Sequence, residues 1–87
     1  MTIYYHRRFE KDLEKKPKRI RVRFYERELL WRADPKNPIL DDHPLSHEYA
    51  GYRSFSVSGD LRVMYQMVGE STALFMRFGT HHELYGS

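Results

Sequence analysis

The sequence predicts an α+β fold in which two N-terminal helices pack on a small, mainly antiparallel sheet. Three observations support this class. The chain has 87 residues, so residues 1–87 are expected to form a single domain. Apolar residues in the first third recur every three or four positions, whereas after residue 51 they alternate with polar ones. The switch falls at a proline-rich segment, which gives the expected order β-α-α-β-β-β.

The N-terminal elements are one short strand and two helices. Residues 2–5 (TIYY) form a β-prone run. Residues 6–16 carry two apolar side chains four positions apart among charged ones, which is typical of a helix with one buried face. Pro17 is expected to end that helix, because its ring disfavours a helical residue before it. Residues 18–33 again show apolar positions three or four apart and are expected to form the second helix.

The C-terminal elements are three strands joined by tight turns. The runs 52–58, 61–68 and 72–78 alternate, and Gly59–Asp60 and Gly69–Glu70 supply turn residues between them. Such short turns make neighbouring strands antiparallel. The proline-rich segment before these strands is expected to be a loop, and the last nine residues a turn or short tail.

Composition excludes several classes of protein. The chain contains no cysteine, so it has neither a disulfide framework nor a thiolate metal site. No apolar run approaches the ~18 residues of a membrane span, and no secretory signal is present. A soluble, cytoplasmic protein without a cofactor or a membrane partner is therefore expected.

Positive charge is concentrated in the N-terminal part. Residues 1–34 hold eleven Lys and Arg against six Asp and Glu, a net charge of +5. Residues 35–87 hold four against six, a net charge of −2, and the two parts sum to the +3 of the whole chain. A basic helical surface suits a polyanion such as RNA, or an acidic protein partner. The alternative is an ordinary solvated helix face.

Polar residues beside the predicted strands indicate acid–base chemistry. Four of the five histidines fall in the segments DDHPLSHEY and FGTHHELY, namely His43, His47, His81 and His82. A third polar segment, SVSGDLR, carries Asp60 and Arg62. Histidine is the side chain best suited to proton transfer near neutral pH. If the strands pair, the three segments converge at one edge of the sheet, which suggests proton-transfer chemistry on a phosphate-bearing substrate.

Several longer segments carry a family resemblance. FEKDLEKKPKRIRVRF near the start is followed by DHPL, GYR, DLRVMY and GTHxELY, in that order and spacing. Together they cover almost the whole chain and resemble the RelE/ParE superfamily of bacterial toxins, most closely its YafQ-like branch. The resemblance implies a RelE/ParE-like fold and the toxin of a type II toxin–antitoxin module. It also implies ribosome-dependent, metal-independent cleavage of mRNA, inhibition of translation, and a cognate antitoxin that blocks this activity.

The resemblance also implies roles for individual residues. His43, Asp60 and His81 match positions associated with catalysis, and His81 is the first candidate for proton transfer. Arg62 resembles an arginine that RelE-like relatives use near the scissile phosphate. Tyr85 matches a C-terminal aromatic associated with activity, where it could stack on a base. A further candidate for substrate binding lies on the first strand of the meander, Arg53.

Three points stay open at the level of sequence. Ser56 stands where YafQ-like toxins can carry a further histidine, and serine does not titrate near neutral pH, which puts a three-histidine mechanism in question. His47 and His82 have no clear family counterpart. The spacing of His43 and His47 could suggest a zinc pair, but Pro44 and the loop setting argue against a rigid metal site. The alternatives to an mRNA endonuclease are a ParE-like gyrase-inhibiting toxin and a catalytically degenerate protein that only binds antitoxin.

The basic helices are the expected contact surface for large partners. Ribosomal RNA phosphates and an acidic or amphipathic antitoxin segment are both expected to contact this surface, for which the candidate residues are Lys15, Lys18, Arg19 and Arg23.

Overall fold

The computed structural model describes residues 1–86 and confirms the α+β class. Helices and strands follow one another as β1 (Thr2–Tyr5), α1 (Arg7–Glu14), α2 (Lys18–Ala33), β2 (His43–Pro44), β3 (Arg53–Ser58), β4 (Leu61–Gly69), β5 (Thr72–Thr80) and α3 (His81–Tyr85). Two short 3₁₀ turns, η1 (Pro38–Leu40) and η2 (His47–Tyr49), lie on either side of β2. The predicted order is thus extended by a two-residue strand before the meander and a short helix after it.

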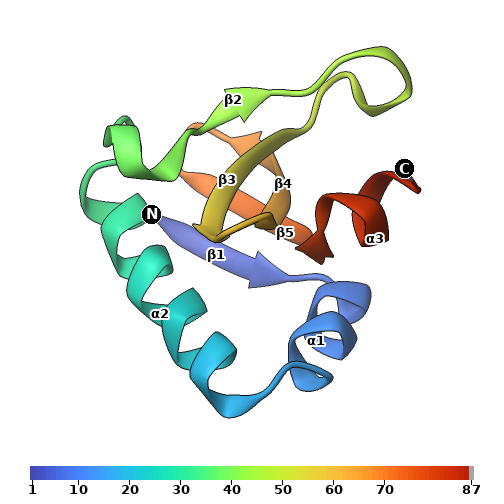
Figure 1. Ribbon diagram of the computed structural model, residues 1–87. Coiled ribbons are helices and arrows are strands. Elements are labelled where there is room, and N and C mark those ends of the chain that lie inside the picture. Colours follow the sequence, from blue (N-terminus) through green and yellow to red (C-terminus); the bar gives the residue numbers. More distant parts are fainter. Residues whose placement is uncertain (87) are drawn as a thin grey trace.

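The sheet has five strands in the order β1-β5-β4-β3-β2. The pairs β5–β4, β4–β3 and β3–β2 are antiparallel, as the turn residues predict, whereas β1 pairs in parallel with β5 from Thr2↔Thr72 to Tyr5↔Phe75. The first strand therefore lies at one edge of the sheet (Figure 1). The rung that matters most for the site places His43, Ser54, Met64 and Arg77 side by side on four adjacent strands.

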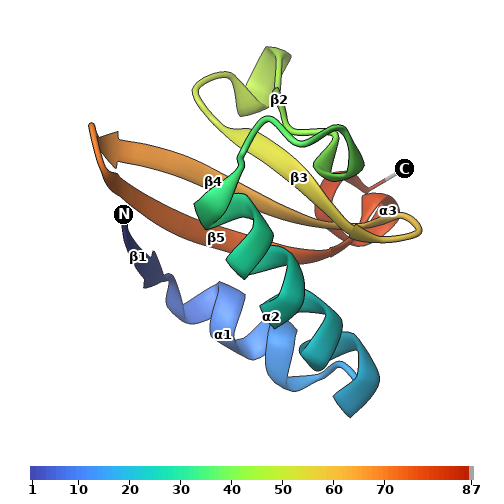
Figure 2. The same ribbon diagram turned by 90° about the vertical axis from the view of Figure 1, so that its left-hand side faces the viewer.

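Helices α1 and α2 cover one face of the sheet (Figure 2). Their apolar residues meet the strands in a core rich in aromatic rings, and the Phe9 and Phe24 rings of the two helices lie 5.2 Å apart. Such ring pairs add about 0.5–1.5 kcal/mol beyond the burial of their area. The other aromatic members of this core come from α2 and the central strands: Trp31, Phe55, Tyr65, Phe75 and Phe78.

A buried carboxylate fixes the proline-rich loop to this core. Asp42 accepts hydrogen bonds from Trp31 Nε1 at 2.9 Å, from the Tyr65 hydroxyl at 2.6 Å and from Arg53 Nε at 2.9 Å. Burial, together with the hydrogen bond to Asp42, raises the pKa of Tyr65 to about 12. Because Asp42 directly precedes His43, this network also determines where β2 begins.

Several element ends differ from the sequence prediction by one or two residues, and three of the differences bear on the site. The first helix begins at Arg7, because His6 is its N-cap and accepts the Arg8 N–H at 3.0 Å through Nδ1. Strand β5 continues to Thr80, two residues beyond its expected end. The expected terminal tail is instead α3, because Thr80 and Glu83 form a reciprocal capping box at its start.

Candidate functional site

Arg62 is the centre of a polar cluster on the sheet face opposite to α1 and α2. Side chains alternate along β4, so Arg62 and Met64 point away from the core that Val63 and Tyr65 enter. The Arg62 guanidinium binds Ser54 Oγ through Nε and donates to the Asp41 carbonyl oxygen through Nη2 at 2.8 Å. Its side chain is only 13% exposed, so it is held in place before any substrate arrives.

His43 lies beside this arginine. Its Nδ1 is 2.9 Å from the Asp41 carbonyl oxygen and 3.4 Å from Arg62 Nη2. A carbonyl oxygen only accepts hydrogen bonds, so Nδ1 carries the hydrogen and Nε2 is the nitrogen left to accept a proton. The ring is exposed, which leaves Nε2 accessible to a substrate.

Asp41 organises both side chains, a role that the sequence reading missed. Its backbone is left-handed, with φ 45°, a conformation that Asp tolerates better than most residues. That conformation directs its carbonyl oxygen toward both His43 and Arg62, while its carboxylate lies 3.3 Å from Arg62 Nη1. The available signal was the Asp-Asp pair directly before His43, because Asp favours turns and left-handed positions.

Ser56 is the cross-strand partner of Arg62. The position at which YafQ-like toxins can carry a further histidine is therefore next to the cluster, and in this chain it supplies a hydroxyl.

His81 and Tyr85 form a second group at the start and end of α3. Their rings are one helical turn apart, with centroids separated by 4.8 Å. The Tyr85 ring also packs edge-on against Tyr49, with centroids 5.2 Å apart, and the Tyr49 hydroxyl donates to the Leu84 carbonyl oxygen at 3.4 Å. The Tyr85 hydroxyl is buried and has no hydrogen-bond partner within residues 1–86. Tyr85 is thus a half-buried side chain whose ring contacts His81 and Tyr49, and its part in substrate binding stays a prediction.

Glu83 fixes the position of α3. One of its carboxylate oxygens accepts from the Thr80 N–H at 2.8 Å and from Lys16 Nζ at 2.8 Å. Lys16 lies in the turn directly after α1. The hydrogen bond from Lys16 and that from Thr80 lower the pKa of Glu83 to about 2. A Cβ at position 79 would lie 3.0 Å from this oxygen, so Gly79 permits the close approach. His81 is therefore positioned by contacts that reach across to α1.

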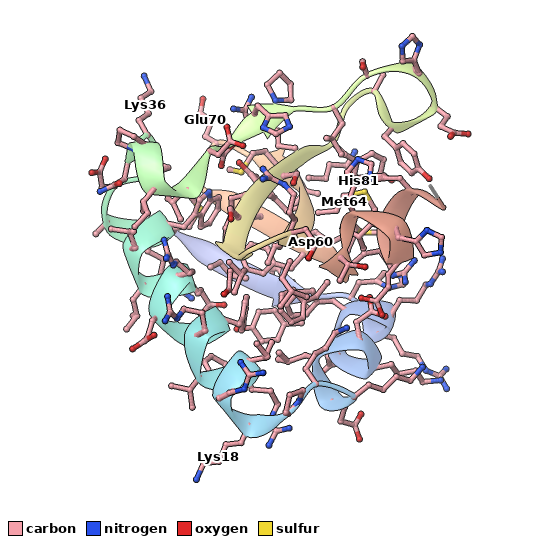
Figure 3. The ribbon with its side chains drawn as sticks, in the orientation of Figure 1. Lys18, Lys36, Asp60, Met64, Glu70 and His81 are labelled. Carbon is pink, nitrogen blue, oxygen red and sulfur yellow. The ribbon has the colours of Figure 1, made fainter. Side chains whose placement is uncertain are left out.

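The sheet register relates the two groups. Arg62 pairs with Gly79 and Leu61 pairs with Thr80, so Asp60 and His81 lie at the same end of adjacent strands. Figure 3 shows Asp60, Met64 and His81 on the side of the molecule next to α3. The structure brings His43 and Arg62 into contact and places His81 two residues beyond Gly79, directly after the end of β5. Asp60 is exposed in the β3–β4 turn, where its side chain makes no ion pair or hydrogen bond with any residue of the described chain.

Arg53 is not part of this site. It faces the α2 side of the sheet, where its Nε donates to Asp42 Oδ1 at 2.9 Å and to the Tyr65 hydroxyl at 3.2 Å. Successive residues of a strand point to opposite faces, so Arg53 and its neighbour Ser54 are separated by the sheet itself.

The remaining candidates lie at the surface. Lys15, Lys18, Arg19 and Arg23 are exposed at the junction of α1 and α2 and along α2, and Figure 3 shows Lys18 at the far end of the helical layer from Lys36. His47 and His82 are exposed on η2 and α3. Among residues 1–86, no group of three or more His, Cys, Asp or Glu side chains is arranged to hold a metal ion. No helix in the same range is long and apolar enough to cross a membrane.

Several solved structures share this fold. The crystal structure of YafQ from E. coli strain BL21(DE3) is 28% identical over 97% of each chain, with a TM-score of 0.81. The toxin–antitoxin complex RelBE2 from Mycobacterium tuberculosis matches at 26% identity over 92% of this chain and 96% of that one, with a TM-score of 0.75. The E. coli DinJ-YafQ complex matches at 27% identity over 97% of each chain, with a TM-score of 0.71.

The sequence was compared with curated proteins and with family models. No curated protein sequence matches the chain significantly. The family model described as the bacterial toxin of a type II toxin–antitoxin system, YafQ, matches residues 1–86. The chain therefore belongs to the YafQ family of type II toxins, within the RelE/ParE superfamily.

Proposed function

We propose that this toxin is a ribosome-dependent endoribonuclease that cuts mRNA by metal-independent acid–base chemistry and so inhibits translation. The observation that carries the proposal is the contact between His43 and Arg62 on the face opposite to the helices, beside the strand that leads into His81. A base, an acid and a cation are the groups that this reaction requires.

Each group has a task in the proposed reaction. His43 Nε2 takes the proton of the RNA 2′-OH, because Nδ1 already donates to Asp41. Arg62 binds the scissile phosphate with the one N–H of Nη1 that its hydrogen bonds to Ser54 and Asp41 leave free. His81 protonates the leaving 5′-oxygen, and Asp60, in the adjacent turn, is proposed to orient His81 only once the substrate is bound, because the two side chains are not hydrogen-bonded in the free toxin. The products are a 2′,3′-cyclic phosphate, or the 3′-phosphate formed from it, and a 5′-hydroxyl.

Tyr85 acts in this scheme by holding His81. Its ring is packed between His81 and Tyr49, so the ring, and not the hydroxyl, is the part that matters. We therefore propose a positioning role for Tyr85 in place of base stacking.

The antitoxin is proposed to cover the outer surface of α2. Val22, Tyr25 and Leu29 lie one helical turn apart and are 47%, 48% and 67% exposed. The basic side chains of Lys18, Arg19 and Arg23 flank this apolar stripe. An amphipathic segment with acidic flanks fits both features and orders as it binds. Before the antitoxin binds, the same cations are available to ribosomal RNA phosphates.

An in vitro translation reaction with mapping of mRNA 5′ ends tests the proposed function. The wild-type toxin is expected to cut message within translated regions, and His81→Ala is expected to reduce cutting by ~10²–10⁴. His82→Ala is the matched control, because His82 is the adjacent exposed histidine of the same helix.

The alternatives give different results in the same experiment. A gyrase-inhibiting toxin leaves the message intact and traps cleaved DNA in a parallel gyrase reaction. A degenerate toxin does neither, yet still binds antitoxin.

A further inference from the structure

A cavity of about 380 Å³ lies next to the Arg62 cluster and has no task in the reaction above. Met64 and Met76 from the sheet and Tyr49 and Tyr52 from the preceding loop form its apolar walls. Met64 is buried but lies outside the helix-side core, so this is a separate pocket on the face that carries Arg62. Its volume falls within the ~300–1,000 Å³ typical of small-ligand sites.

Charged groups at the rim define what the cavity can accept. Arg8 on α1 is exposed there. The Nη1 of Arg77 is left to contact a ligand, because Nε and Nη2 donate to the Asp12 carboxylate at 2.7 and 3.3 Å. Glu48 adds an acceptor for ring or exocyclic N–H groups. Aromatic rings and thioethers below two guanidinium groups suit a planar base attached to a phosphate.

The cavity lies beside the proposed site of cleavage. Met64 is two residues from Arg62 on the same strand face, a separation of about 7 Å. It also pairs with Ser54, the residue whose hydroxyl Arg62 binds. A strand of RNA with its phosphate on Arg62 can therefore place a neighbouring base in the cavity.

We propose that this cavity binds one base of the single-stranded RNA substrate, next to the scissile linkage. The inference rests on the proposed endoribonuclease function and gives it a subsite that selects the nucleotide. Tyr52 stacks on the base, while Arg8 and Arg77 bind the adjacent phosphate.

Tyr52→Ala is the sharpest test, because Tyr52 lines the cavity and does not hold α3 as Tyr49 does. Across many transcripts, this variant is expected to lose the nucleotide preference at one position beside the cut, while Tyr52→Phe keeps it. The matched control is Tyr4→Ala, which removes a tyrosine that is 60% exposed on β1.

A binding measurement separates this inference from the cleavage reaction. Affinity for a labelled five-nucleotide RNA, measured by fluorescence anisotropy, is expected to fall about 5- to 150-fold in Tyr52→Ala, the range for one stacked base. Arg8→Gln is expected to weaken binding and reduce its salt dependence, whereas the adjacent Arg7→Gln does neither. The two failures are distinguishable: if the wild-type toxin cuts no message, the proposed function fails, whereas unchanged RNA affinity in Tyr52→Ala and Arg8→Gln shows that the cavity does not bind RNA.

Two outcomes overturn the inference. One is unchanged cut-site preference and unchanged RNA affinity in both Tyr52→Ala and Arg8→Gln. The other is a loss of antitoxin affinity in these variants with RNA affinity retained, which assigns the cavity to the protein partner.

Discussion

The ion pair between Lys16 and Glu83 is expected to make the stability of the toxin depend on pH in the acid range. Glu83 is a capping residue of α3, and its carboxylate also accepts from Lys16 Nζ at 2.8 Å. Glu83→Gln keeps the side-chain shape and the capping hydrogen bonds but removes the charge. The variant thus isolates the electrostatic link between α1 and the helix that carries His81.

The magnitude follows from the pKa of Glu83. Its fall from 4.5 to about 2 corresponds to about 3 kcal/mol of folding free energy by linkage. The Glu83 side chain is 47% exposed, so solvent screening reduces the expected contribution to about 1 kcal/mol. Because the folded-state pKa is the lower one, this stability is present above pH 4.5 and is lost as pH falls toward 2.

Urea denaturation across this pH range measures the effect. The difference in unfolding free energy between wild type and Glu83→Gln is expected to shrink from about 1 kcal/mol at pH 6 to near zero at pH 2. Glu70→Gln, in the β4–β5 turn, is the control and is expected to show no such trend. A difference that stays constant with pH would show that Lys16 does not stabilise the charged form of Glu83.

Three further outcomes are expected. Asp42→Ala should lower the unfolding free energy, measured in urea, by about 3–5 kcal/mol. The change leaves Trp31 Nε1 and the Tyr65 hydroxyl without their acceptor and the Arg53 guanidinium without its ion pair. A loss below about 1 kcal/mol would contradict the anchoring role of Asp42. Tyr85→Phe should cut mRNA at the wild-type rate and be at least as stable as the wild type, because it removes a buried hydroxyl without a partner in the described chain. Tyr85→Ala should cut mRNA much more slowly. An equal loss of cutting rate in both variants would mean that the hydroxyl itself acts. Leu29→Asp should weaken antitoxin binding at least tenfold in calorimetry, whereas Ile39→Asp, which changes another exposed apolar residue on η1, should not. Equal effects would remove the α2 stripe as the docking surface.

The fold was largely predictable because its main elements have clear periodicity. The second helix matches residues 18–33 fully, and each meander strand was placed to within two residues. Helix α3 has only five residues, too few for a periodic signal, although the capping pair Thr80 and Glu83 was readable in the sequence. The parallel pairing of β1 with β5 joins positions about 70 residues apart, which local patterns do not encode.

The faces of the sheet on which the candidate site residues lie were more predictable than the contacts between those residues. Alternation along the meander places Arg62 and Ser56 on one face, and the same rule places Arg53 on the other, where Asp42 binds it. The residue type of Asp41 favours its left-handed backbone, but the sharing of its carbonyl oxygen between His43 and Arg62 depends on the tertiary packing of the proline-rich loop, which no sequence pattern predicts. Arg53 is the arginine of the GYR motif, and a motif alone does not show which face of the sheet its side chain occupies.

The central claim is that the 2′-OH of the message attacks the phosphate bound by Arg62. The most direct measurement uses a purified ribosome reaction with two messages that differ only by a single 2′-deoxy nucleotide at the mapped cut. The account predicts that the ordinary message yields a 5′-hydroxyl and a 2′,3′-cyclic phosphate end, and that the deoxy message is not cut at that site. Cleavage of the deoxy message at the same position, or a product with a 5′-phosphate, would contradict it.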